Sequence, residues 1–155
     1  MVTKFTYLSF VPQIYEVLEF LKGTLDIGGK NIEKCPSIFY MAPENIRLNW
    51  GFLKERNIRT SNIETCLHIL STEPVELRKT YEYVVTNYGE RYLNANTSIL
   101  RVSINRIKEL EERLTNVKKK TILQAAISSF SIEECVKVVE VCNKNKIEVT
   151  GSVFF

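Results

Sequence analysis

The sequence predicts an all-α fold, a right-handed helical-repeat solenoid of about five two-helix units of roughly 31 residues each. Two positive observations and one exclusion lead to this prediction. The N-terminal part of the chain matches itself at an offset of 31 to 32 residues, and apolar residues recur at helical spacing in the later part. Six Gly and four Pro in 155 residues are too few for a turn-rich β fold.

The internal match is strongest between the first two units. One gap, placed in a loop, changes the offset from 32 to 31 residues and gives eleven identities. They include Phe20-Leu21-Lys22 with Phe52-Leu53-Lys54, Ile27 with Ile58, Asn31-Ile32-Glu33 with Asn62-Ile63-Glu64, Cys35 with Cys66, and Pro43 with Pro74. Later copies diverge, although Ser37, His68 and Ser98 share one position and Asn57-Ile58 matches Lys146-Ile147. We therefore predict a single repeat domain over residues 1–155, with units at 13–44, 45–75, 76–105, 106–134 and 135–155.

Each unit is expected to hold a long helix followed by a short one. Helical spacing of apolar residues marks long helices across 77–88, 104–117 and 132–142, and short helices are expected near 30–39, 61–71, 95–102 and 119–130. Ser61 and Ser131 are predicted N-caps because each has a glutamate three residues on. Residues 147–155 suit a strand or a capping helix, and we favour the helix. Because two short helices cannot bury an apolar face alone, such units must stack on their neighbours.

The two best-matched units resemble a known repeat. The stretch Asn31–Phe39, followed by a periodic helix that ends in Phe52-Leu53-Lys54 and then Asn57-Ile58, is similar to the repeat of mitochondrial transcription termination factors. The resemblance is good over residues 13–75 and loose beyond them. It implies a solenoid that binds nucleic acid on a positive concave face. The chain departs from the repeat at Asn57, where the family has glycine, and it is shorter and less basic than the family pattern.

Composition indicates an intracellular protein of the cytoplasm or an organelle matrix. The net charge is +3, and the whole excess lies in residues 101–155, which carry ten basic and seven acidic side chains. The four cysteines form no CxxC pair and lie in apolar helical contexts, as buried reduced thiols do. No segment has the character of a membrane span or signal peptide. We expect a monomer that does not associate with membranes.

The sequence offers no catalytic or metal-binding constellation. His68 is the only histidine, which argues against a His-based triad, and no glycine-rich phosphate loop is present. The expected role of His68 is packing on a short helix. We therefore predict a protein that is not an enzyme and that uses no cofactor and no metal.

Basic residues recur at one position of the repeat. Arg47, Arg78, Lys108 and Lys137 follow the opening apolar residue of successive long helices, at spacings of 31, 30 and 29 residues. In a solenoid these positions align along one edge, about 10–20 Å apart, and a row of cations suits a phosphate backbone. We refer to these four residues as the cation ladder. Tyr15 occupies the position in the first unit.

The densest basic cluster is Lys118-Lys119-Lys120 with nearby Arg113, at the predicted start of a short helix. Together with the ladder it favours non-catalytic binding of DNA or RNA through phosphate contacts. The alternative is a protein-interaction scaffold or inhibitor that uses a concave surface, because charges are balanced through residue 100 and the residue beside a core position is often a solvated cation. Salt-dependent binding of generic nucleic acid separates the two.

Overall fold

The structure is a computed structural model that describes residues 4–60 and 62–155, with side chains described from residue 12 onward. Every regular element in the described ranges is helical, which confirms the all-α prediction. Among these residues no helix is both long enough and apolar enough to cross a membrane. Residue contacts divide the chain into two compact bodies, Met1–Pro74 and Val75–Phe155, called here the N-terminal and C-terminal bodies.

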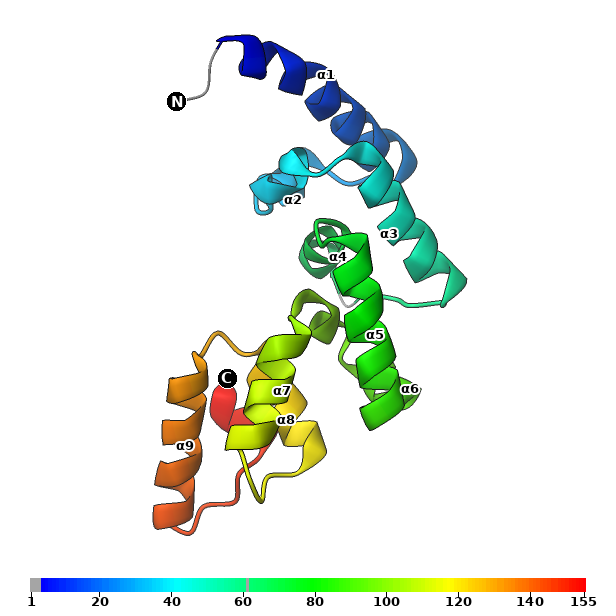
Figure 1. The fold of residues 1–155 in the computed structure, drawn as a ribbon. Coiled ribbons are helices and arrows are strands. Elements are labelled where there is room, and N and C mark those ends of the chain that lie inside the picture. The colour runs from blue at the N-terminus through cyan, green and yellow to red at the C-terminus, as the bar shows by residue number, and fades with distance from the viewer. Residues whose placement is uncertain (1–3, 61) are drawn as a thin grey trace. The chain divides into compact units, whose positions relative to one another are not determined.

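The N-terminal body alternates long and short helical segments (Figure 1). The first long segment is α1 (Lys4–Glu19), which continues as one stretch of π-helix, η1 (Phe20–Thr24). Two short elements follow, α2 (Gly29–Ile32) and the 3-10 helix η2 (Pro36–Tyr40). The second pair is the long α3 (Pro43–Glu55) and the short α4 (Ile63–Leu70). Proline opens both η2 and α3, where its missing N–H costs no hydrogen bond.

The C-terminal body continues the same alternation. Its long helices are α5 (Pro74–Tyr88), α7 (Ile104–Arg113) and α9 (Ile132–Lys144). The short elements are α6 (Glu90–Ala95) with the 3-10 helix η3 (Thr97–Arg101), then α8 (Lys119–Ile127), then the 3-10 helix η4 (Gly151–Phe154). The bounds of α5, α7, α8 and α9 agree with the predicted helices to within a few residues. The short helix predicted near 95–102 is observed as η3, whereas α6 before it was not predicted. The preference for a helical cap over a strand at the C-terminal end is also confirmed, by η4.

Long helices pack against long helices, and short elements against short ones, within each body. In the N-terminal body α1 contacts α3, and α4 contacts α2 and η2. In the C-terminal body α7 contacts α9, and α8 contacts both η3 and η4. The side chain of Tyr83 on α5 reaches Glu111 on α7, so these two long helices are also neighbours. Each body is therefore built of a long-helix layer and a short-helix layer.

Apolar side chains fill the space between the two layers. Ile46 and Leu53 on α3 are buried, as are Leu67 and Leu70 on α4, and these two helices are in contact. Burying a side chain of this kind contributes about 1.5–3 kcal/mol. All four cysteines are free and buried, as the sequence predicted.

The ends of the long helices share one backbone feature. A residue with positive φ follows each of them, and these residues are Asp26, Asn57, Gly89, Asn116 and Lys146. After α3 and α9 the next residue closes the turn in a Schellman motif, in which Ile58 N–H donates to Leu53 O (2.9 Å) and Ile147 N–H donates to Cys142 O (2.8 Å). The sequence match between Asn57-Ile58 and Lys146-Ile147 is therefore a match of helix ends.

A polar side chain on each of the first four long helices binds carbonyls at the end of the short element that follows. Gln13 donates to Met41 O (3.0 Å), and Thr80 donates to Val102 O (3.2 Å). Asn49, which is only 1% exposed, donates to the carbonyls at the end of α4, the shortest contact being 2.6 Å to Thr72 O. Arg106 does the same at the end of α8. We call these four side chains the carbonyl clamps. They satisfy C=O groups that a helix end leaves without partners.

Helix N-termini are capped by side chains where the sequence allows. The Ser131 side chain accepts a hydrogen bond from Glu134 N–H, which confirms that predicted N-cap. Ser103, which was not among the predicted caps, caps α7 in the same way. The other predicted cap, Ser61, lies outside the described residues, and the N-cap of α4 is Asn62, whose Oδ1 accepts from Thr65 N–H at 2.7 Å.

Candidate nucleic-acid interface

The four ladder residues lie exposed on the long helices α3, α5, α7 and α9. In the N-terminal body Arg47 forms an ion pair with Glu16 of α1 at 2.9 Å, and its guanidinium also lies 5.8 Å from the centre of the Phe20 ring. These contacts connect two neighbouring long helices. The positive charge of Arg47 is thus offset by a carboxylate in the same layer.

The remaining ladder residues belong to the C-terminal body. The Lys108 ammonium lies 5.3 Å from the centre of the Tyr83 ring, which connects α7 to α5. The Tyr83 hydroxyl donates to Glu111, and the pKa of Tyr83 rises to about 12 through burial first and Glu111 second. Arg78 is exposed on α5 and Lys137 on α9, where Lys137 helps to lower the pKa of Glu133.

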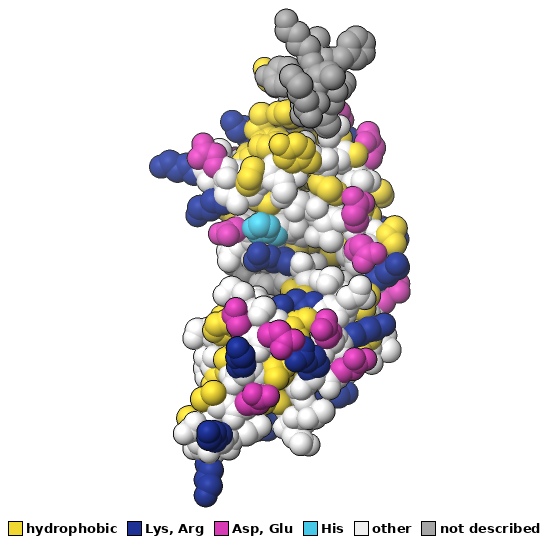
Figure 2. All heavy atoms as spheres, turned by 60° about the vertical axis from the view of Figure 1, so that its left-hand side comes forward, with side chains coloured by type: hydrophobic (Ala, Val, Ile, Leu, Met, Phe, Trp, Pro, Cys, Tyr) yellow, Lys and Arg dark blue, Asp and Glu magenta, His cyan; other side chains and the backbone are white. Residues whose placement is uncertain are grey.

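The long helices of each body therefore carry a mixed charge pattern. Arg113 makes a two-pronged ion pair with Glu133 of α9, with Nη2 3.0 Å from Oε2, and this hydrogen bonding is the main reason that the pKa of Glu133 is lowered. Basic and acidic side chains are also intermixed on the face that Figure 2 shows, which includes the histidine of the short helix α4. A phosphate that approached Arg47 or Arg113 would have to compete with a carboxylate already in place.

The lysine cluster lies where the sequence placed it, at the N-terminus of α8. Lys118 is the N-cap residue and pairs with Glu148 at 3.3 Å. The Lys119 ammonium donates to Asn87 O (3.3 Å) and lies 5.9 Å from the centre of the Tyr88 ring. Lys120 is exposed and makes no ion pair with any described residue. Lys120 is therefore the member of the cluster whose charge is open to a ligand.

Two hollows meet at Lys120. The first, which we call the α6 hollow, has a volume of about 510 Å³ and is lined by Arg91, Tyr92, Ala95, Asn96 and Lys120. The second, the η4 hollow, has a volume of about 540 Å³ and is lined by Lys118, Lys120, Thr121, Gln124, residues 148–152 and Phe155. Both volumes lie in the range of small-ligand sites. Arg91 is exposed and, within the described residues, has no ion-pair partner.

A pair of side-chain amides joins the two hollows. Gln124 Nε2 donates to Asn96 Oδ1 at 2.6 Å, and Asn96 Nδ2 donates to Tyr92 O at 3.2 Å, so both amides are held in place. Gly151 supports this arrangement from η4. A Cβ atom at Gly151 would lie 2.7 Å from Gln124 Cγ, so a larger residue would displace the glutamine.

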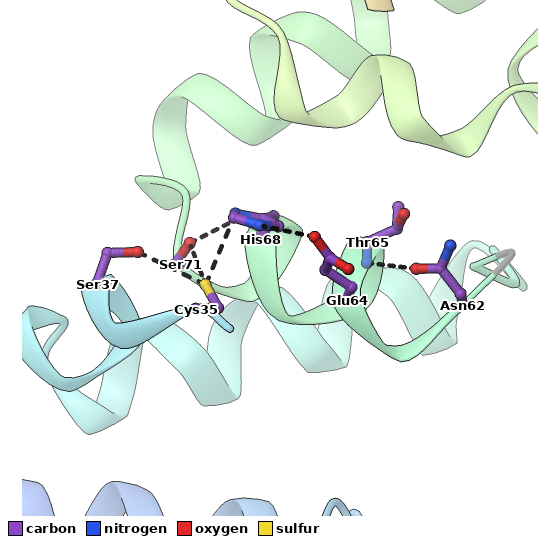
Figure 3. A network of polar contacts seen from close by, with 7 residues as sticks. All are labelled: Cys35, Ser37, Asn62, Glu64, Thr65, His68 and Ser71. Atoms are coloured by element: carbon purple, nitrogen blue, oxygen red, sulfur yellow. Dashed lines mark hydrogen bonds and ion pairs between the residues drawn. The ribbon is translucent and has the colours of Figure 1, made fainter. Parts of the chain in front are cut away.

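The short-helix layer of the N-terminal body holds a second polar cluster (Figure 3). Cys35 Sγ lies 3.6 Å from His68 Nδ1 and 3.5 Å from Ser37 Oγ, and His68 Nε2 lies 4.0 Å from Glu64 Oε1. A thiol, an imidazole and a carboxylate in series resemble the parts of a nucleophilic site. However, Cys35 is fully buried in the packing between α4 and η2, and reactive cysteines are partly exposed. The cluster therefore connects neighbouring short helices.

Neither the described residues nor the comparisons point to a known cofactor or family. Within residues 4–60 and 62–155, no group of three or more His, Cys, Asp or Glu side chains is arranged to hold a metal ion. Comparison of the chain with protein-family models, with curated proteins and with solved structures finds no match.

Sequence reasoning identified Lys118, Lys119 and Lys120 but missed Arg91, Asn96 and Gln124. The last two are 28 residues apart, close to the repeat length, and that spacing is the one signal that could have linked them. Arg91 lies outside the periodic ladder position, so a search for periodic cations does not find it.

Proposed function

We propose that this chain is a non-catalytic, monomeric helical-repeat protein that binds nucleic acid by contacting the phosphate backbone through a basic face. The observation that carries the proposal is the junction of the two hollows at Lys120, where Lys120 and Arg91 lack ion-pair partners among the described residues. A phosphate there gains two cations without displacing a carboxylate. Electrostatic contacts of this kind supply most of sequence-independent affinity.

The proposal includes a right-handed solenoid in which successive units stack. Its support is the two-layer packing inside each body, the positive-φ residue after each long helix and the carbonyl clamps of the first four units. The similarity of residues 13–75 to the mitochondrial transcription termination factor repeat points the same way. In such a stack Arg78, Lys108 and Lys137 would provide further positive charge along the long-helix layer.

Fluorescence anisotropy with labelled DNA and RNA of generic sequence tests the proposal. The titration is run at low salt and again near physiological salt, with wild type, the double variant Arg91→Glu/Lys120→Glu and the control Lys34→Glu. Lys34 is an exposed lysine of the N-terminal body outside both hollows. We expect affinity to fall with salt, and the double variant to weaken binding to all sequences and to reduce the salt slope by about 2. Absence of binding to wild type at low salt would falsify the proposal.

A second function, a protein-interaction scaffold or inhibitor, is favoured by a different observation. Arg47, Arg113 and Lys118 are already paired with carboxylates. Large apolar side chains are also exposed on the N-terminal body, with Tyr15 at 68% and Tyr40 at 79%. Two results together would establish this function instead. This protein would bind no nucleic acid, and a pull-down with it would recover one defined protein partner after nuclease treatment.

A further inference from the structure

We infer that the α6 and η4 hollows are two adjacent nucleotide subsites for a single strand, with the phosphate between the two nucleotides on Lys120. The inference rests on the proposed nucleic-acid binding and adds the substrate class, single-stranded rather than duplex. Its basis is that each of the two hollows is lined by an aromatic ring, a side-chain amide and a cation.

The first shared group is an aromatic ring at the edge of the hollow. Tyr92 lines the α6 hollow with 39% of its surface exposed, and Phe155 lines the η4 hollow with 73% exposed. Bases of single strands stack on such rings, and stacking tolerates any sequence because every base has a π face. In a duplex the bases are already stacked on one another and cannot reach a ring inside a hollow.

The second shared group is a side-chain amide with capacity left for hydrogen bonding. One N–H of Gln124 is used in the bond to Asn96, and one N–H of Asn96 is used in the bond to Tyr92 O. Each amide therefore retains a second N–H, and each oxygen retains a lone pair. An amide that presents a donor and an acceptor side by side matches the edge of an unpaired base.

The third shared group is the cation. Lys120 lines both hollows, and Arg91 adds a second positive charge at the α6 hollow. Among the described residues, the one side-chain carboxylate that lines either hollow is that of Glu148, and it is paired with Lys118. A backbone phosphate between two bound bases would meet Lys120 at the boundary of the hollows, which is the arrangement that a single strand requires.

Competition between a single strand and its duplex tests the inference. The probe is a labelled homopyrimidine single strand of about 10 nucleotides, within the site sizes of single-strand-binding modules. Wild type is compared with Tyr92→Ala, Tyr92→Phe and the control Tyr15→Ala, a residue that is 68% exposed on α1. Far-UV circular dichroism and thermal unfolding confirm that each variant is folded.

We expect the single strand to compete at least about tenfold better than the duplex. Tyr92→Ala should weaken single-strand binding at least about fivefold, the lower range for loss of one base–aromatic stack, while Tyr92→Phe and Tyr15→Ala change it little. Two results would overturn the inference: a duplex affinity that equals or exceeds the single-strand affinity, or an unchanged single-strand affinity in folded Tyr92→Ala. If binding still depended on salt in either case, the proposed function would stand. If the wild type bound neither the single strand nor the duplex, the inference and the proposed function would both be wrong, and the protein-interaction scaffold would be the remaining function.

Discussion

Replacing Arg106 on α7 by alanine should destabilise the C-terminal body. The guanidinium of Arg106 reaches four carbonyl oxygens at and beyond the end of α8. Nε donates to Ala126 O at 2.9 Å, and Nη2 contacts Ala125 O (3.1 Å), Ser128 O (3.3 Å) and Phe130 O (2.6 Å). Ala125, Ala126 and Ser128 are buried, so most of these oxygens have little access to water when the arginine is removed.

The expected loss follows from the number and type of these contacts. A hydrogen bond from a charged donor contributes about 1.5–3 kcal/mol, and contacts that share one nitrogen do not add fully. Two effective bonds, reduced by partial access of water near Phe130, give a loss of about 3 kcal/mol in the free energy of unfolding. For a chain of this length that corresponds to a fall of about 6–12 °C in Tm. Arg106→Lys keeps the charge but not the planar fork, and should lose about half as much.

Urea unfolding followed by far-UV circular dichroism measures the change in the free energy of unfolding. The matched control is Arg101→Ala, an exposed arginine on η3 with no hydrogen bond or ion pair described, and it should change stability by less than about 0.5 kcal/mol. If Arg106→Ala and Arg101→Ala lost the same small amount of stability, the hydrogen bonds of Arg106 would not stabilise the end of α8, and this prediction would be wrong.

Two further changes test other features of the fold. Asn57 has a φ of +54° after α3, so Asn57→Ala should cost about 1 kcal/mol in urea unfolding, whereas Asn57→Gly should be neutral or stabilising; the opposite order would refute the role of the left-handed turn. The pKa of Tyr83 is raised in the folded state to about 12, so the folded protein retains this proton more tightly than the unfolded chain, whose tyrosine has a pKa near 10. This contribution is complete below pH ~10 and is lost as pH rises toward ~12, and the stability difference between wild type and Tyr83→Phe should therefore shrink over that interval in denaturant titrations.

Local patterns were sufficient to predict most of the helices, but not α6 or the first residues of α1. The spacing of apolar residues placed α5, α7 and α9 closely, because a helix that packs on one side must repeat its apolar positions every three to four residues. The repeated pairs Asn57-Ile58 and Lys146-Ile147 both lie at helix ends, because a left-handed turn depends on adjacent residues alone. Ser131 was predicted for the same reason, since an N-cap acts within one turn.

Features that depend on contacts between helices were not predicted. The carbonyl clamps Gln13, Asn49, Thr80 and Arg106 are different residue types, and each is separated from its acceptors by 19 to 28 residues. No one-letter pattern marks them. The hollows are also tertiary features, because α6, α8 and η4 contribute side chains that lie far apart in the sequence.

The cation ladder shows why periodicity alone does not identify a ligand contact. Arg47 and Lys108 share one position of the repeat, yet Arg47 pairs with Glu16 and Lys108 lies over the Tyr83 ring. Exposed ion pairs contribute only about 0–1 kcal/mol, so each is weak, but a phosphate must still displace the carboxylate before it gains the cation. Lys120 and Arg91 have no carboxylate partner within residues 4–60 and 62–155, so no such exchange is needed there. A periodic charge therefore identifies equivalent backbone positions, whereas the neighbours of each side chain decide whether its charge is available to a ligand.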